Sequence, residues 1–120
     1  MAKILVHVTC GPEQPTRAAL AFAVASAAMQ EGHTATLFLA ADAVQLLRDP
    51  VLDALSGLGT GKLRDHHDKF VAAGGRFYVS SGSSNARGVT DNELTGKPYE
   101  FATPAVLVRL MVEYDRVVTY

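Results

Sequence analysis

The chain has 120 residues, of which 48% are apolar and 19% charged, and its formal net charge at neutral pH is -1. A chain of this length is expected to form one domain that buries roughly 65% of its unfolded surface, so its core needs neither a metal nor a disulfide. The near balance of 11 basic and 12 acidic residues excludes the clustered positive charge that binding to nucleic acid or to an anionic membrane surface requires.

The first half of the chain predicts alternating strands and helices. In chain order these are a strand, a helix, a strand and a short helix over residues 3–8, 17–31, 34–39 and 42–47. Thr16 is expected to cap the first helix and Gly32 to end it, while Asp49 and Pro50 are expected to stop the short helix.

The second half opens with residues 55–61, where three closely spaced glycines predict a loop. The elements expected after it are a helix over 62–73, a strand over 76–79, a polar loop over 80–85, a helical turn over 90–95, a strand over 99–101, a helix from 104 and a last strand over 116–120. Strands separated by helices require crossover connections, so the sequence predicts a three-layer α/β fold with a mainly parallel sheet of about five strands.

Ligands of open parallel sheets bind beyond the carboxyl ends of the strands, which directs attention to the loops 9–17 and 80–88. Hydroxyls, an amide and guanidinium groups in these loops are the donors that a carboxylate, sulfate or phosphate needs. The candidate anion-binding residues are Arg17, Ser80, Ser81, Ser83, Ser84, Asn85 and Arg87. The alternative is that they satisfy a surface turn, with Arg87 paired to Asp91 or Glu93.

No cofactor and no metal are expected. The glycines of residues 57–62 have one spacer too few for a phosphate loop, and the third glycine of a dinucleotide fingerprint would fall at Lys62. His66 and His67 are adjacent, so on a helix they point about 100° apart and cannot share a metal ion. His7 and His33 are isolated in the sequence.

Two apolar helices indicate self-association. Residues 18–30 carry no charge and residues 104–112 carry only Arg109, whereas a helix that covers one face of a sheet should be polar on its other side. We therefore expect a second subunit to cover part of these helices, with the last helix as the better candidate. The alternative for the first helix is an alanine-rich surface that tolerates solvent.

The compartment is predicted from Cys10, the only cysteine, which cannot form a disulfide within the chain and fits the reducing cytoplasm. The apolar run over residues 4–8 is shorter than the core of a signal peptide. The longest uncharged stretch, residues 18–30, is shorter than a membrane span. We expect a cytoplasmic protein without a signal peptide or a membrane segment.

Four short motifs, in the same order, resemble the DsrE/DsrF-like family over almost the whole chain. They are Gly11-Pro12 followed by Arg17-Ala18-Ala19, Gly32-His33-Thr34 leading to Leu37-Phe38, Ala86-Arg87-Gly88, and Glu113-Tyr114-Asp115-Arg116-Val117. The resemblance implies a small cytoplasmic α/β homo-oligomer, often a trimer or hexamer. It also implies relatives that relay sulfur as cysteine persulfides.

The resemblance puts the reactive cysteine of the sulfur-relaying relatives at Ser80 or Ser83, and neither side chain can carry a persulfide. Sulfur transfer needs an ionised sulfur nucleophile. We therefore expect a protein that is not an enzyme and that binds a small anion or acts as an accessory. The alternative is a sulfurtransferase-like or thiol-redox protein in which Cys10 is the catalytic nucleophile, its pKa lowered by a helix start and Arg17, acting with a sulfur-relay partner protein.

Overall fold

The fold is built on one sheet of five strands, in a computed structural model that describes residues 1–120. The strands are β1 (Lys3–Val8), β2 (Thr34–Leu39), β5 (Arg76–Ser80), β6 (Tyr99–Ala102) and β7 (Arg116–Thr119), in the order β6-β5-β2-β1-β7. Each neighbouring pair is parallel, and Leu5 lies opposite Thr36 on one side and Val117 on the other. The predicted α/β class and parallel sheet are confirmed.

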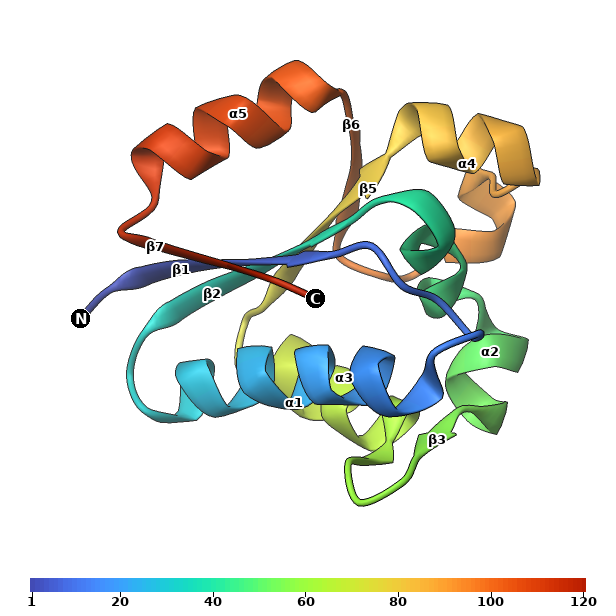
Figure 1. Cartoon of the computed structure of the whole chain (residues 1–120), viewed down its shortest axis with the longest axis horizontal. Helices are drawn as coiled ribbons and strands as arrows, with labels where there is room; N and C mark the ends of the chain where they lie inside the picture. The colour runs from blue at the N-terminus through green and yellow to red at the C-terminus, as the bar shows by residue number, and fades with distance from the viewer.

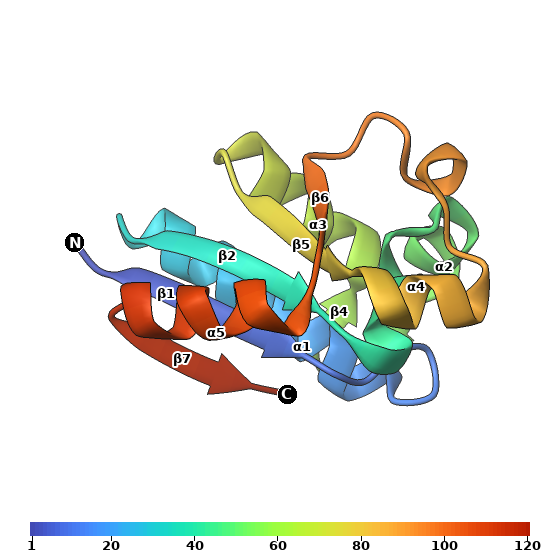
Figure 2. The same ribbon diagram turned by 90° about the horizontal axis from the view of Figure 1, so that it is seen from above.

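The helices cover the two faces of the sheet unequally. They are α1 (Pro15–Gln30), α2 (Asp49–Ala54), α3 (Leu63–Ala72), α4 (Ser81–Arg87) and α5 (Pro104–Glu113), with the 3-10 helices η1 (Ala41–Leu47) and η2 (Asp91–Leu94). Figure 1 shows α1 and α3 together below the sheet, whereas α5 lies above it and α4 lies beyond one end. Seen from above, α5 runs along the sheet without a neighbouring helix (Figure 2). None of the helices has the length and apolar character needed to cross a membrane.

The core follows the alternation of side chains along the strands. Val6 and Val8 of β1 join the larger cluster of 23 buried residues beneath α1 and α3, whereas Leu5 joins the smaller cluster beneath α5. A parallel sheet buried on both faces favours such continuous apolar strands. The smaller cluster is completed by Phe38, Ala102 and Leu110, so α5 covers it almost alone.

The segment predicted as a glycine-rich loop is instead an antiparallel hairpin of β3 (Ser56–Gly57) and β4 (Gly61–Lys62). Thr16 does not cap α1, because its hydroxyl accepts the Leu58 N–H at 3.0 Å. In return the Thr60 hydroxyl donates to the Thr16 carbonyl at 3.0 Å. The hairpin packs on α1 at Gly57, where a Cβ would lie 3.0 Å from the Thr16 Cα.

The short helix predicted over residues 42–47 is η1, which ends at Leu47 as expected. Pro50 also lies in the first turn of a helix that was not predicted, α2, where the missing N–H of proline has no cost. The serine-rich segment predicted as a loop is the helix α4, although serine and glycine are weak helix formers. Ser80 begins this helix by accepting the Ser83 N–H at 3.3 Å, and Gly88 ends it in the left-handed conformation.

Candidate functional site

The carboxyl ends of β1, β2 and β5 meet at one edge of the sheet. At this edge the chain after β1 touches the start of η1, because a Cβ at Gly11 would lie 2.3 Å from the Asp42 carbonyl oxygen. Ala40, the last residue before η1, donates its N–H to the Val8 carbonyl at 2.9 Å. The segments that follow the first two strands therefore lie side by side at the edge where α4 begins.

An ion pair connects α4 to η1. Nε and Nη2 of Arg87 both lie 3.0 Å from Oδ1 of Asp42, and Nη1 donates to the Ser83 carbonyl at 3.2 Å. Arg87 thus has an acidic partner, as the alternative interpretation expected, but the partner is 45 residues away in the chain. The two carboxylates named from the sequence bind elsewhere, Asp91 to the Tyr99 hydroxyl and Glu93 to Arg48.

A hydrogen bond from η1 to Ser83 fixes the same junction. The Ser83 hydroxyl accepts the Ala41 N–H at 2.9 Å. Ala41 has φ 52° and is the only residue other than glycine with a positive φ. This conformation costs on the order of 1 kcal/mol and persists only where the surroundings hold it. Ser83 and Arg87 of α4 therefore hold the strained start of η1 from one side.

The other predicted side chains of α4 point to different surroundings. The Ser81 hydroxyl donates to the Ala102 carbonyl at 3.0 Å, which ties α4 to the end of β6. Ser81 and Asn85 also line a small pocket of about 270 Å³, whose other lining residues are Val89, Thr90, Asp91 and Phe101. Ser84 is 1% exposed, and its hydroxyl has no hydrogen-bond partner. The serine-rich set does not converge on one cavity.

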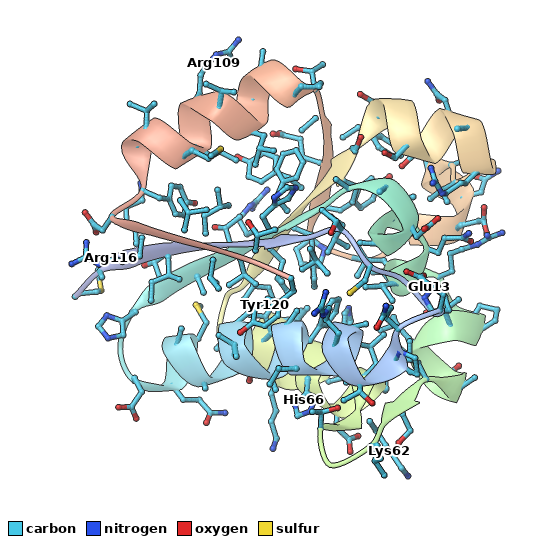
Figure 3. All side chains as sticks on the ribbon, viewed as in Figure 1. Glu13, Lys62, His66, Arg109, Arg116 and Tyr120 are labelled. Carbon is cyan, nitrogen blue, oxygen red and sulfur yellow. The ribbon has the colours of Figure 1, made fainter.

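The thiol of Cys10 lies in surroundings that keep it protonated. The residue is 7% exposed at the end of β1, and burial raises the pKa of its thiol. The carboxylate of Glu13 raises this pKa further, and the opposite effect of Arg17 is the weaker one. Both Glu13 carboxylate oxygens accept the Gly11 N–H, at 2.9 and 3.0 Å, in the loop that precedes α1 (Figure 3).

The histidines have separate surroundings. His66 donates from Nε2 to the Thr60 carbonyl at 2.7 Å, which ties α3 to the hairpin. His67 is buried, stacks on Phe77 and lies 2.8 Å from Asp68 through Nδ1, while its Nε2 has no partner. Burial lowers the pKa of His67. No group of three or more His, Cys, Asp or Glu side chains is arranged to hold a metal ion.

The sequence analysis missed the two residues that organise this edge, Ala41 and Asp42. Asp42 follows β2 almost directly, and in a parallel sheet the end of β2 lies at the same edge as the ends of β1 and β5. This position directly after the second strand was the signal that could have identified Asp42. The prediction was limited to the loops after the first and third strands. The strained conformation of Ala41 leaves no signal in the sequence.

Comparisons with known proteins agree with this architecture. The model of the DsrE/DsrF-like family matches residues 2–120. The solved structure of the YchN protein from E. coli superposes with a TM-score of 0.80 at 19% identity, and both chains are covered completely. MTH1491 from Methanobacterium thermoautotrophicum, described as a protein of unknown function, gives a TM-score of 0.72 at 14% identity, again over 100% of both chains. No curated protein matches the sequence. At these identities the two structures share the fold alone.

Proposed function

The chain belongs to the DsrE/DsrF-like family, and within that family we propose that it is a non-catalytic, self-associating protein of the cytoplasm. In this proposal it carries no persulfide of its own and acts as an accessory that binds a small anionic ligand. The observation that carries the proposal is the structural use of Ser80 and Ser83, the positions where the resemblance expects a reactive cysteine. One hydroxyl caps α4, and the other holds the backbone of Ala41.

The surroundings of Cys10 support the same conclusion. A persulfide carrier must present a thiolate near neutral pH to an external sulfur donor. Burial and the neighbouring Glu13 both raise the pKa of the Cys10 thiol, and its small exposed area limits the approach of a donor. Arg17, which was expected to lower this pKa, does so too weakly to offset these effects.

The proposed anionic ligand would bind at Arg87. The guanidinium already holds one carboxylate oxygen of Asp42, so its position suits a carboxylate, sulfate or phosphate group. Arg87 and Asp42 are both partly exposed, which makes exchange of Asp42 for an external anion feasible. The remaining predicted residues would act around it, Ser83 beside the guanidinium and Ser81 with Asn85 in the adjoining pocket.

Self-association is supported by α5 and not by α1. α3 and the β3–β4 hairpin pack against α1 within the chain (Figure 1), and Leu20 is the one large apolar side chain exposed on this helix. On α5, in contrast, Val108 is 58% exposed, Met111 46% and Val112 83%. Contiguous exposed apolar side chains mark interaction surfaces. The family resemblance favours a trimer or a hexamer.

The proposal is tested by exposing the native protein to a low-molecular-weight persulfide and measuring the intact mass. Native protein should gain no sulfur, whereas unfolded protein, in which Cys10 is exposed, should gain one sulfur atom. Introducing Ser83→Cys into a Cys10→Ser background supplies a thiol at the family position, and this native variant should gain one sulfur atom where the wild type gains none. Rapid addition of sulfur to Cys10 in the native wild type would contradict the proposal and favour the alternative, a sulfur-relay or thiol-redox protein that uses Cys10.

A further inference from the structure

We infer that the outer side of α5 pairs with the same surface of a second copy of this chain, antiparallel across a two-fold axis, so that Arg109 of each copy meets Glu113 of the other. This inference rests on the self-association proposed above and fits the hexamer, because a closed trimer contains no two-fold contact. It adds which surface makes the contact, what the partner is and how the two copies are oriented.

The apolar surface is a ridge on the side of α5 that faces away from the sheet. Leu110 is buried against the sheet. Val108 and Val112 lie four residues apart, so one stands above the other on the opposite side of the helix. Met111 extends the ridge on one flank. We call Val108, Met111 and Val112 the α5 ridge.

No other surface of the chain offers a comparable group. The remaining large apolar side chains that are exposed are Met1, Leu20, Leu58 and Val117. They come from four different segments, and apolar side chains exposed singly are normal on protein surfaces. The α5 ridge also stands free, since α5 is the only helix above its face of the sheet (Figures 1 and 2).

The charges beside the ridge identify the partner. The side chain of Arg109 makes no ion pair and no hydrogen bond within the chain, and Figure 3 shows it pointing away from the body of the protein. Glu113 lies four residues further along the helix, hence on the same flank as Arg109. It contacts Lys3 at 3.0 Å but keeps 61% of its side chain exposed. The same flank of α5 therefore carries the unpaired guanidinium of Arg109 and the accessible carboxylate of Glu113, four residues apart.

Two-fold symmetry makes this surface complementary to itself. When two antiparallel helices pair across such an axis, the same flanks meet with their residue order reversed. With the axis near Met111, Arg109 and Glu113 each lie about 3 Å along the helix from it, so each arginine is level with a glutamate of the other copy. A parallel two-fold arrangement would instead place the flank that carries Arg109 and Glu113 against the opposite flank, which carries Met111, so these charges would find no partner. The charges thus favour a second copy in the antiparallel orientation.

The experiment is a charge exchange on the full chain, with the mass of the assembly measured by sedimentation at several protein concentrations. Val112→Glu should lower the mass of the assembly at least twofold, because a two-fold contact joins two halves. Arg109→Glu and Glu113→Arg should each weaken assembly by about tenfold, since each brings like charges together. The double exchange should restore assembly to within about threefold of wild type. Leu58→Glu, an equally exposed position on the hairpin, is the control and should change nothing.

The outcomes separate this inference from the proposal on which it depends. A monomeric wild type would overturn both. An oligomeric wild type that Val112→Glu leaves intact would overturn the α5 contact and keep self-association through another surface. Loss of assembly with Val112→Glu, but no rescue by the double exchange, would overturn the antiparallel arrangement. Circular dichroism of each variant at a concentration where it is monomeric should match wild type, because all the changed side chains are exposed.

Discussion

Replacing two adjacent serines of α4 by alanine should change the free energy of unfolding in opposite directions. Ser83→Ala removes the acceptor of the Ala41 N–H, a partly buried hydrogen bond of 2.9 Å. An N–H left without a partner costs about 1–3 kcal/mol, and the better helix propensity of alanine returns about 0.5 kcal/mol. The expected net loss of stability is about 1–2 kcal/mol.

Ser84→Ala should stabilise the protein by about 1 kcal/mol. The Ser84 hydroxyl is buried without a hydrogen-bond partner, so the folded state carries its desolvation cost and gains nothing in return. Alanine removes that cost and favours the helix. Ser84 is therefore the matched control for Ser83, one residue away in the same element.

Both changes can be measured by urea unfolding followed by circular dichroism, at one pH and one protein concentration. For a chain of this size 1 kcal/mol corresponds to about 4 °C in Tm, which thermal unfolding resolves. Equal effects of the two substitutions would refute the assigned roles. A loss of stability with Ser84→Ala would mean that this hydroxyl has a partner, and no loss with Ser83→Ala would mean that η1 is held by other contacts.

Three further predictions concern the core and the carboxyl edge of the sheet. Burial lowers the pKa of His67 below the value of about 6.5 in the unfolded chain. Between these two pKa values the unfolded state binds more protons, so the stability of the fold decreases as the pH is lowered. His67→Gln should make the free energy of unfolding, measured in urea titrations between pH 7 and 5, depend less on pH; an unchanged dependence would contradict the burial of His67 as a neutral ring. Gly11→Ala should destabilise the protein by several kcal/mol, since the Cβ would overlap the Asp42 carbonyl; a neutral effect would show that the segment after β1 does not touch η1. Tyr114→Phe should cost about 1 kcal/mol in thermal unfolding through loss of the 2.7 Å bond to Thr36, and a neutral result would count against that bond.

The strands and the parallel sheet were predictable because their signal is local. Apolar runs of five or six residues, each followed by a turn or a helix start, fix where strands begin and end. The segments that were mispredicted depend on longer contacts. The β3–β4 hairpin is held by Thr16, 42 residues from Leu58, and its two short strands have no periodicity to detect. Pro50 begins α2, because proline suits a helix start as well as a stop.

The sequence indicated which segments meet at the carboxyl edge of the sheet but not how their side chains pair. The rule that ligands of parallel sheets bind beyond the carboxyl ends of the strands directed attention to Gly11 and to α4, and the structure places both at that edge. The partner of Arg87 was sought among nearby acidic residues, yet the fold supplies Asp42 from η1, which follows β2, the strand next to β5. Pairing between distant segments is decided by strand order, which a single sequence does not reveal.

The proposed function requires Cys10 to remain a protonated thiol at neutral pH, and the rate at which iodoacetamide alkylates Cys10 in the native protein, followed against pH, tests this most directly. Because burial and Glu13 both raise the pKa of this thiol, the midpoint should lie above the ordinary value of about 8.5, and Glu13→Gln should lower it. Alkylation that has already reached its plateau at pH 7 would mean that Cys10 is a thiolate under physiological conditions, and the account of a non-catalytic protein would fail.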